Sequence, residues 1–318
     1  MQGNEGHADP CNQGVSVVIP CYNYARFLKS AVDSVLAQDY NEFEVIVIDD
    51  GSKDETPEVA KAYGDKIRYI RQVNQGLSAT RNNGIPQCQY PYVAFLDADD
   101  EWEPNFLSSL MEKFSGLSGD FGMVACLDYK IGIDSKKIPD REHNECTGEI
   151  TSRDLILKNR FFPGGAIVKT KVFSEVGNFD TKLKSSEDRD MWIRLSSKFR
   201  IWLLPGRLIR VRKHGDNMSA NGQRMMDNKL AVLHKAYQQK VVPHSDFSTW
   251  LQAKALLNYQ VSWIFHNQYK RRESFVTILK SLTLWPLPVD VSRLDVPVFF
   301  RIRALLRFFI ESFKSPPH

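Results

Sequence analysis

The sequence lacks the features that define several protein classes. Its five cysteines include no C-x-x-C pair, which predicts reduced thiols and neither a disulfide framework nor a zinc site. No stretch of about 18 uncharged apolar residues could span a bilayer, and the polar residues 1–14 carry no apolar signal-peptide core. No dense run of lysine or arginine accompanies an aromatic stacking platform, so nucleic-acid binding is not predicted. We therefore expect a soluble, cytoplasmic protein.

The chain does contain enough apolar material for a large core. Its 318 residues are 42% hydrophobic, which suits one large α/β domain or a domain with an appendage. A formal net charge of +4 is only mildly basic, and it identifies no partner by itself.

Four apolar runs in the first third of the chain predict buried strands. They are residues 15–20 (VSVVIP), 43–50 (FEVIVIDD), 66–72 (KIRYIRQ) and 92–97 (YVAFLD). The apolar character of the fourth run, residues 92–97, is continuous up to its last residue, which is typical of a strand covered on both faces in a parallel sheet.

Helical patterns separate these strands. Apolar residues recur at helical spacing between Phe27 and Leu36, and residues 77–84 suit a helix that ends at Gly84. Ser52 with Glu55 resembles a capping box that would start a helix running to about Tyr63. The alternation predicts a doubly wound α/β sheet.

Acidic residues follow two of the predicted strands. Asp49 and Asp50 end one, and Asp97 and Asp99 follow another. In doubly wound sheets, ligands bind beyond the carboxyl ends of the strands. The two acidic ends are therefore expected to converge on one crevice.

The rest of the chain changes character twice. Residues 121–212 mix strand patterns with one amphipathic helical pattern, and residues beyond about 223 are mainly helical in pattern. We expect a disordered lead-in at residues 1–14, an α/β domain at 15–222 and a helical region at 223–318.

The last helical pattern is amphipathic and basic. Its apolar face would hold Phe299, Ile302, Leu306, Phe309 and Phe313, with Arg301, Arg303 and Arg307 nearby. Such a helix can lie on anionic lipid, which would make residues 296–314 a peripheral membrane contact. It can equally pack on its own domain or on a second subunit in a homo-oligomer, and both interpretations stay open.

Asp97, Ala98 and Asp99 place two carboxylates two residues apart just after a strand. Both can lean toward one divalent cation and the phosphate oxygens that it bridges. Oxygen ligands suit Mg²⁺ or Mn²⁺, either of which would stabilise negative charge on a departing diphosphate. A solvated acidic turn explains this short motif equally well.

The residues Asp49-Asp50-Gly51-Ser52 end the second predicted strand. A carboxylate there could accept a hydrogen bond from a ribose hydroxyl or a base N–H, and glycine permits a tight turn or close approach. An N-cap followed by a turn is the alternative interpretation.

Taken together, residues 15–56, then NQGLSATRNNGI, then FLDADDEW resemble a family 2 glycosyltransferase of the GT-A fold, over about Val15 to Ser219. The resemblance implies a Rossmann-like, doubly wound mixed sheet with a helical extension. It also implies an inverting enzyme that uses a nucleotide-diphosphate sugar, most often a UDP-sugar, with Mn²⁺ or Mg²⁺. The acceptor would be a carbohydrate or lipid-linked, and the setting bacterial polysaccharide or lipopolysaccharide synthesis.

By the same resemblance, six positions contact the donor and three the metal. The donor set is Pro20, Tyr22, Asp50, Arg81, Asp97 and Ala98, and the metal set is Asp99, Asp97 and His214. For two of these a simpler role competes: Arg81 could form a surface ion pair, and His214 could be an ordinary exposed histidine.

Inversion requires a base that removes a proton from the attacking acceptor hydroxyl. The resemblance aligns the family's Glu-Asp motif with Glu187-Asp188, so Asp188 is the expected base and Glu187 the alternate. A solvated, acid-rich helix N-terminus is the competing interpretation. Trp192 and Gly165 are expected near the acceptor, against the alternatives of a core tryptophan and an ordinary turn.

Two other functions compete with glycosyl transfer. A nucleotidyltransferase would also bind nucleotide and metal, but no glycine-rich phosphate loop with Arg or Lys follows the first strand. A nucleotide-sugar or carbohydrate-binding module without turnover is the other alternative. The acids at all three strand or helix ends argue against that module.

Overall fold

The computed structural model describes residues 13–139, 147–215, 222–289 and 299–312, so most of the expected lead-in, residues 1–14, lies outside the described residues. The chain divides into two compact units. The first takes residues up to 139, 161–181 and 199–213, and the second takes 140–160, 182–198 and 214–318. The units interleave along the sequence, whereas the sequence analysis placed one boundary after residue 222.

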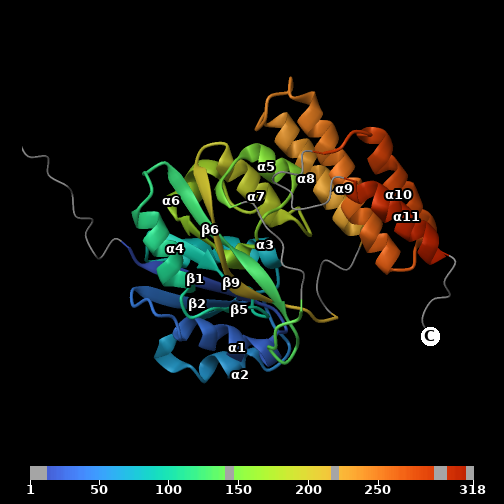
Figure 1. Ribbon diagram of the computed structural model, residues 1–318. Coiled ribbons are helices and arrows are strands. Elements are labelled where there is room, and N and C mark those ends of the chain that lie inside the picture. The colour runs from blue at the N-terminus through green and yellow to red at the C-terminus, as the bar shows by residue number, and fades with distance from the viewer. Residues whose placement is uncertain (1–12, 140–146, 216–221, 290–298, 313–318) are drawn as a thin grey trace, which may run out of the picture. The chain divides into compact units, whose positions relative to one another are not determined.

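The described part of the first unit contains a mixed sheet (Figure 1). Eight of its strands follow one another in the order β3-β2-β1-β4-β8-β6-β9-β5. β1 pairs in parallel with β2 and β4, whereas β8 runs antiparallel to β4 and β6. The strands are β1 (Val15–Cys21), β2 (Phe43–Asp49), β3 (Arg68–Arg71), β4 (Tyr92–Phe95), β5 (Glu101–Trp102), β6 (Phe121–Ile131), β8 (Ala166–Lys169) and β9 (Arg200–Arg212). The predicted mixed α/β sheet is confirmed.

Short helices connect these strands. They are α1 (Ala25–Leu36), α2 (Thr56–Lys61), α3 (Leu77–Gly84), α4 (Phe106–Ser115) and α6 (Lys171–Val176), with single turns η2 (Gly64–Lys66), η3 (Ile85–Gln87) and η4 (Pro163–Gly165). α3 ends at Gly84 as predicted. The two strand patterns expected within residues 200–212 form the single strand β9.

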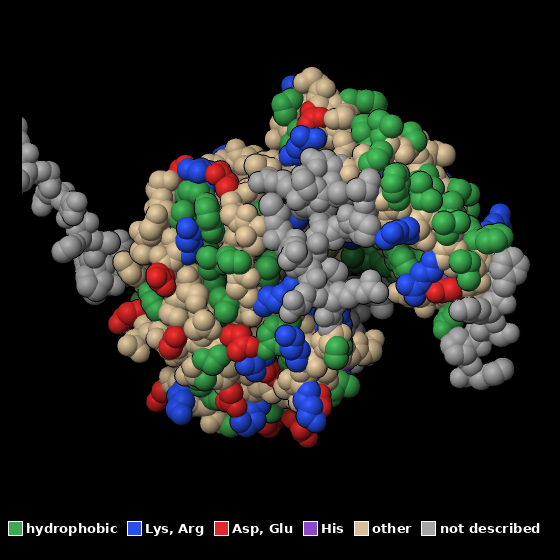
Figure 2. Space-filling view, in the orientation of Figure 1, with side chains coloured by type: hydrophobic (Ala, Val, Ile, Leu, Met, Phe, Trp, Pro, Cys, Tyr) green, Lys and Arg blue, Asp and Glu red, His purple; other side chains and the backbone are tan. Residues whose placement is uncertain are grey.

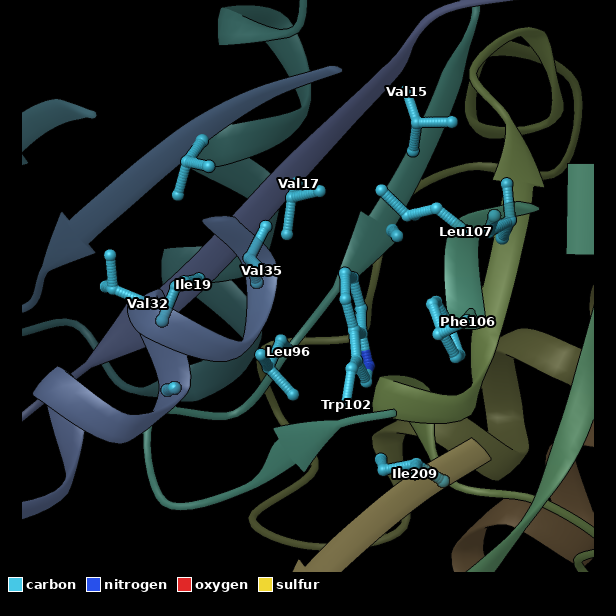
Figure 3. Packing of buried hydrophobic residues seen from close by; sticks show 14 of the residues in the cluster. Val15, Val17, Ile19, Val32, Val35, Leu96, Trp102, Phe106, Leu107 and Ile209 are labelled. Atoms are coloured by element: carbon cyan, nitrogen blue, oxygen red, sulfur yellow. The ribbon is translucent and has the colours of Figure 1, made fainter. Parts of the chain in front are cut away.

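The central strand β1 is buried along its whole length. Val17 and Ile19 share one core cluster with Val32 of α1 (Figure 3). Val18 points toward α3, since a Cβ added to Gly84 would lie 2.5 Å from its Cγ1 atom. Both faces of β1 are therefore covered, which explains why its sequence is apolar apart from Ser16.

Trp102 anchors the core under the acidic turn. Its ring stacks on Phe106 (Figure 3), with centroids 4.1 Å apart. Its indole Nε1–H donates to the Gly164 carbonyl at 2.6 Å. An aromatic pair of this kind, with its polar atom satisfied, holds the start of α4 and the η4 turn together.

The predicted capping box at Ser52 and Glu55 is wrong. Glu55 is the N-cap of α2 and makes no side-chain capping bond. The Ser52 hydroxyl instead accepts from the Asn23 N–H at 2.9 Å, and Asp54 Oδ1 accepts from the Thr56 N–H at 3.1 Å. The loops after β1 and β2 are thereby joined, and α2 begins later than predicted.

The second unit is mainly helical, as expected for the C-terminal region. Its elements are β7 (Gly148–Ile150), α5 (Ser152–Leu157), α7 (Glu187–Ser196), α8 (Gly222–Gln238), α9 (Phe247–Asn267), α10 (Arg271–Leu284) and α11 (Phe300–Ser312). α9 packs against α8 and α10, and α10 packs against α11. Ile278, Ala304 and Phe308 form a small core between the last two. None of the described helices is both long and apolar enough to cross a membrane.

Candidate active site

Three strand ends meet at one edge of the sheet in the first unit. β1 lies between β2 and β4, and all three run in parallel. Tyr22 directly follows β1 and is 41% exposed, whereas Pro20 within the strand is buried. Asp50 follows β2 and Asp97 follows β4. The sheet topology therefore brings the two predicted acidic ends to the same edge, as the sequence analysis expected.

Asp50 is buried and organises the loop before α3. Its Oδ1 accepts from the Gln72 side-chain amide at 2.7 Å and the Gln75 N–H at 2.8 Å, while Oδ2 accepts from the Gly76 N–H at 2.8 Å. These bonds satisfy backbone N–H groups just before the helix and fix where it begins. Gln72 was not singled out from the sequence, because nothing local to it shows the contact.

Arg81 of α3 reaches the acidic turn. Its guanidinium is only 1% exposed, and its Nη2 lies 2.6 Å from Asp97 Oδ1. Its Cζ also lies 5.5 Å from the centre of the Phe179 ring. The surface ion pair considered for Arg81 is thus wrong because the residue is buried. Asp50 positions α3, and α3 positions Arg81 against Asp97.

The acidic turn after β4 is not a solvated loop. Asp100 and Glu101 are each only 6% exposed, and Ala98 is buried as well. Asp97 keeps 31% of its side chain exposed, and Asp99 is also partly exposed. Burial raises the pKa of Asp100 well above its usual range, and the nearby charges of Asp99 and Asp97 raise it further. Carboxylates are therefore crowded here.

Two arginines of β9 neutralise this turn, and the sequence analysis missed both. Arg210 holds Glu103 through two bonds, at 2.9 and 2.8 Å, and Arg212 pairs with Glu101. Their spacing of two residues on a strand puts them on one face, which was a usable signal. The partner acids lie more than 100 positions away in sequence, so the pairing itself was not readable.

Asp97 and Asp99 fit a hard divalent cation. Both supply carboxylate oxygens, both are partly exposed, and crowded negative charge favours a cation beside them. Among the described residues, no three His, Cys, Asp or Glu side chains are grouped as a complete metal site. A cation bound here would need further oxygen ligands, such as those of a diphosphate and water.

The predicted base and its alternate open α7 in the second unit. Glu187 and Asp190 are buried, while Asp188 is partly exposed and its Oδ2 accepts from the Asn159 side-chain amide at 2.8 Å. Asp190 is held by Arg194 at 2.9 Å and by Lys235 at 3.0 Å. A solvated acidic helix end is therefore wrong for Glu187 and Asp190, and Asp188 is the most accessible of the three.

Asp188 interacts electrostatically with two cationic residues of the same unit, Arg189 and Lys229. Arg189 is buried and donates to the Leu155 and Ile156 carbonyls at the end of α5, at 3.0 and 2.6 Å. Burial lowers the pKa of Lys229 to about 8, the charge of Arg189 lowers it further, and Asp188 opposes this shift. The Lys229 ammonium donates to Gln260 at 2.8 Å.

Of the remaining predicted residues, Trp192 and Gly165 are buried and His214 is partly exposed. Trp192 is fully buried, so its ring cannot contact a sugar. The predicted acceptor contact is therefore wrong, and the side chain packs in the core. Gly165 is buried in η4, where an added Cβ would lie 3.2 Å from the Cys126 carbonyl oxygen, so close packing explains this glycine. His214 is partly exposed and belongs to the second unit.

Comparison with known proteins agrees with this architecture. The family model described as glycosyl transferase family 2 matches residues 16–177. The chain belongs to this family. Within it, an uncharacterised glycosyltransferase of Rickettsia bellii is 34% identical over 96% of this chain and 44% of its own length. One from Rickettsia prowazekii is 33% identical over 63% of this chain and 64% of its own. The chain thus spans about half the length of the curated relatives it matches.

Two solved structures share the family's fold. Residues 1–349 of Staphylococcus aureus TarS, in complex with UDP-GlcNAc, superpose with a TM-score of 0.57 at 18% identity, over 95% of this chain and 93% of that one. A Pyrobaculum calidifontis mannosyltransferase in complex with GDP-Man and Mn²⁺ gives a TM-score of 0.60 at 15% identity, over 95% and 88%. At these identities the likeness shows the fold alone, and it confirms the predicted GT-A architecture.

Proposed function

We propose that this protein is an inverting glycosyltransferase that moves a sugar from a nucleotide-diphosphate donor to an acceptor hydroxyl. The observation that carries the proposal is the linked edge of the sheet. There, Asp50 positions α3, and Arg81 of α3 pairs with a partly exposed Asp97 beside Asp99. Family 2 membership supports glycosyl transfer over nucleotidyl transfer.

The donor diphosphate would lie at Asp97 and Asp99, which would hold Mn²⁺ or Mg²⁺. A cation held there would offset negative charge on the leaving diphosphate. Arg81 is buried at the same edge, where its guanidinium would hold Asp97 in place beside the cation. Tyr22, exposed after β1, is the proposed border of the nucleobase. A UDP-sugar is the proposed donor, supported by the bound UDP-GlcNAc of TarS.

Asp188 is the proposed base. Its carboxylate takes the proton of the acceptor hydroxyl while the hydroxyl oxygen bonds to the anomeric carbon. The bond from that carbon to the diphosphate oxygen breaks, and its electron pair leaves on the diphosphate. Asn159 holds one oxygen of Asp188 and leaves the other for this transfer. Glu187 is buried, which favours Asp188 over it.

A nucleotide-sugar screen tests the function directly. The protein is incubated with UDP- and GDP-sugars and a carbohydrate acceptor, with Mn²⁺ or with EDTA, and release of nucleoside diphosphate is measured. We expect metal-dependent release from one donor class. Nucleotide-sugar binding with no release from any donor would establish the alternative, a binding module without turnover.

We also propose that α10 and α11 bind an anionic bilayer surface, where a lipid-linked acceptor of bacterial polysaccharide or lipopolysaccharide synthesis would be found. Exposed apolar side chains gather on these helices (Figure 2): Val276, Leu279, Ile302, Leu306, Phe309 and Ile310. Exposed Lys280, Arg303 and Arg307 lie on the same two helices, and this positive charge suits anionic headgroups.

The prediction that Arg301 belongs to this surface is wrong, and Phe313, which was also predicted there, lies outside the described residues. Arg301 is only 4% exposed, because its guanidinium binds the carbonyls of Ser281, Trp285 and Leu287 at 2.6–2.9 Å. It therefore fixes the start of α11 and cannot contact lipid. Phe313 is not among the described residues.

Vesicle sedimentation tests the bilayer surface. Wild type should bind vesicles that contain phosphatidylglycerol, less strongly at high salt, and Leu306→Glu should abolish binding. Phe247→Glu, at an exposed apolar residue of α9, is the matched control and should bind normally. A concentration-dependent dimer that Leu306→Glu disrupts, without vesicle binding, would instead make this face a contact between two copies.

A further inference from the structure

Arg212 lies on β9 and binds the acidic turn, and among the cations that do so it makes the largest number of the hydrogen bonds described here. It ends β9, is 1% exposed, and its guanidinium lies 4.9 Å from the centre of the Phe27 ring. A buried guanidinium is stable only where hydrogen-bond acceptors replace its water. The atoms that Arg212 bonds therefore show what the residue is placed to hold.

Arg212 bonds both the backbone and the side chains of the acidic turn. Its Nε–H donates to the Asp99 carbonyl at 2.8 Å, and its backbone N–H donates to Asp100 Oδ1 at 2.9 Å. Its Nη2 pairs with the Glu101 carboxylate. Three consecutive residues of the turn are thus bonded to one residue of β9.

The other side of Arg212 bonds the turn after β6. Its Nη1 donates to the Gly132 and Ile133 carbonyls, both at 2.9 Å, and its Nη2 donates to Ser135 Oγ at 3.0 Å. Ser135 in turn donates to Glu101 at 2.6 Å. The planar guanidinium therefore joins two loops, a geometry that a lysine ammonium cannot reproduce.

Arg210 provides a natural comparison two residues earlier on β9. It holds Glu103 through two bonds, and its contact with Glu101 is longer, at 3.4 Å. None of the bonds described for Arg210 reaches Asp97, Asp99 or Asp100. Both arginines neutralise the same acidic segment, but only Arg212 is bonded to the backbone of the residue assigned to the metal.

We propose that Arg212 is a positioning residue that fixes Asp99 for binding of the divalent cation and the diphosphate. This inference rests on the proposed function. By holding the Asp99 carbonyl, Arg212 fixes the backbone from which the Asp99 carboxylate projects. Removing a group that orients a metal ligand typically lowers the affinity for the metal by about 10- to 100-fold.

The test is a calorimetric titration of Mn²⁺-dependent nucleotide binding, with UDP in one series and GDP in another. Arg212→Lys keeps the charge but loses the two-loop geometry. We expect it to raise the Mn²⁺ concentration for half-maximal nucleotide binding by about 10-fold or more. Arg210→Lys, the matched control, should change it by less than about twofold, although both variants lose stability. Thermal midpoints without Mn²⁺ separate that loss of stability from the effect on metal.

The outcomes distinguish this inference from the proposed function. An equal Mn²⁺ requirement in wild type and Arg212→Lys, with Mn²⁺-dependent binding intact, overturns the positioning role alone. Wild type that binds neither UDP nor GDP with Mn²⁺ overturns the proposed function, and the inference with it. If Arg212→Lys does not fold, Glu101→Gln weakens the same network. It should raise the Mn²⁺ requirement about threefold, and an unchanged requirement again overturns the inference.

Discussion

The two acidic segments of this protein neutralise their charge in different ways. In the first unit, residues 97–103 depend on arginines from distant parts of the chain: Arg81 from α3, and Arg210 and Arg212 from β9. In the second unit, residues 187–190 begin a helix whose own Arg194, four positions on, holds Asp190 together with Lys235 of α8. The first arrangement depends on the sheet, and the second largely on helical spacing.

The comparison separates structural acids from those available for chemistry. Buried acids such as Glu101 and Asp190 are paired with cations and hold elements together. Asp97, Asp99 and Asp188 remain partly exposed. Glu103 is partly exposed as well, but both of its carboxylate oxygens are bonded to Arg210. Exposure and bonding partners together therefore favour Asp97 and Asp99 in the first segment and Asp188 in the second, where the sequence showed only runs of carboxylates.

The largest expected effect is at Asp99. Asp99→Asn should abolish Mn²⁺-dependent nucleotide binding and lower turnover about 1,000-fold or more, because a charged oxygen ligand becomes a neutral amide. Glu103→Gln, in the same segment but held by Arg210, should lower the thermal midpoint and leave the Mn²⁺ requirement unchanged. Calorimetry with Mn²⁺ and UDP checks both variants. Equal nucleotide binding by Asp99→Asn and wild type would contradict the assignment of Asp99 to the metal.

Asp188 provides the matching test in the second segment. Asp188→Asn should lower turnover by about 10²- to 10⁴-fold with donor binding retained, because the proton acceptor is lost. Asp190→Asn should mainly lower stability. Steady-state kinetics and thermal denaturation of both variants check this division. Full turnover by Asp188→Asn would move the base to another residue.

A smaller effect is expected at Asp50. Asp50→Asn replaces one accepting oxygen with a donor amide that faces N–H groups, so it should lower the free energy of unfolding by about 1–3 kcal/mol. Gln72→Ala removes only one of the three bonds and should cost less. Urea denaturation measures both. A variant as stable as wild type would show that the loop before α3 does not depend on Asp50.

The last expected effect, of similar size at most, is a pH dependence of stability that comes from Lys229. Its pKa is lowered to about 8 in the folded protein, against about 10.4 when unfolded. Between these values the unfolded chain binds more protons, so the stability of wild type rises with pH relative to Lys229→Met. The difference should change by at most about 3 kcal/mol from pH 7.5 to pH 10.5. Lys254→Met, at an exposed lysine of α9, should show no such change, and a flat difference for Lys229→Met would contradict the lowered pKa.

The sequence predicted the sheet better than the contacts around it. Continuous apolar strands and the acids that follow them are local patterns, so the order of elements and the shared edge of Asp50 and Asp97 could be read directly. The ion pairs and hydrogen bonds of Arg210 and Arg212 could not be predicted, because they join segments more than 100 positions apart in sequence. The capping-box prediction was wrong for a related reason. The Ser52 hydroxyl accepts a hydrogen bond from the backbone N–H of Asn23, which is distant in sequence.

Residue type alone also gave little information on burial. Trp192 and Gly165 were assigned to the acceptor, but both pack in the interior. Arg301 was grouped with exposed cations of the last helix, but it binds three carbonyls. Each depends on the partners that the fold supplies, which a helical or strand pattern does not specify.

The most direct test is a crystal structure of the protein grown with UDP and Mn²⁺, with anomalous diffraction measured to locate the manganese. We predict a manganese peak about 2.0–2.3 Å from a carboxylate oxygen of Asp99, with diphosphate oxygens of UDP completing its ligands. UDP and manganese bound away from the ends of β1, β2 and β4 would contradict the assignment of this edge as the donor site.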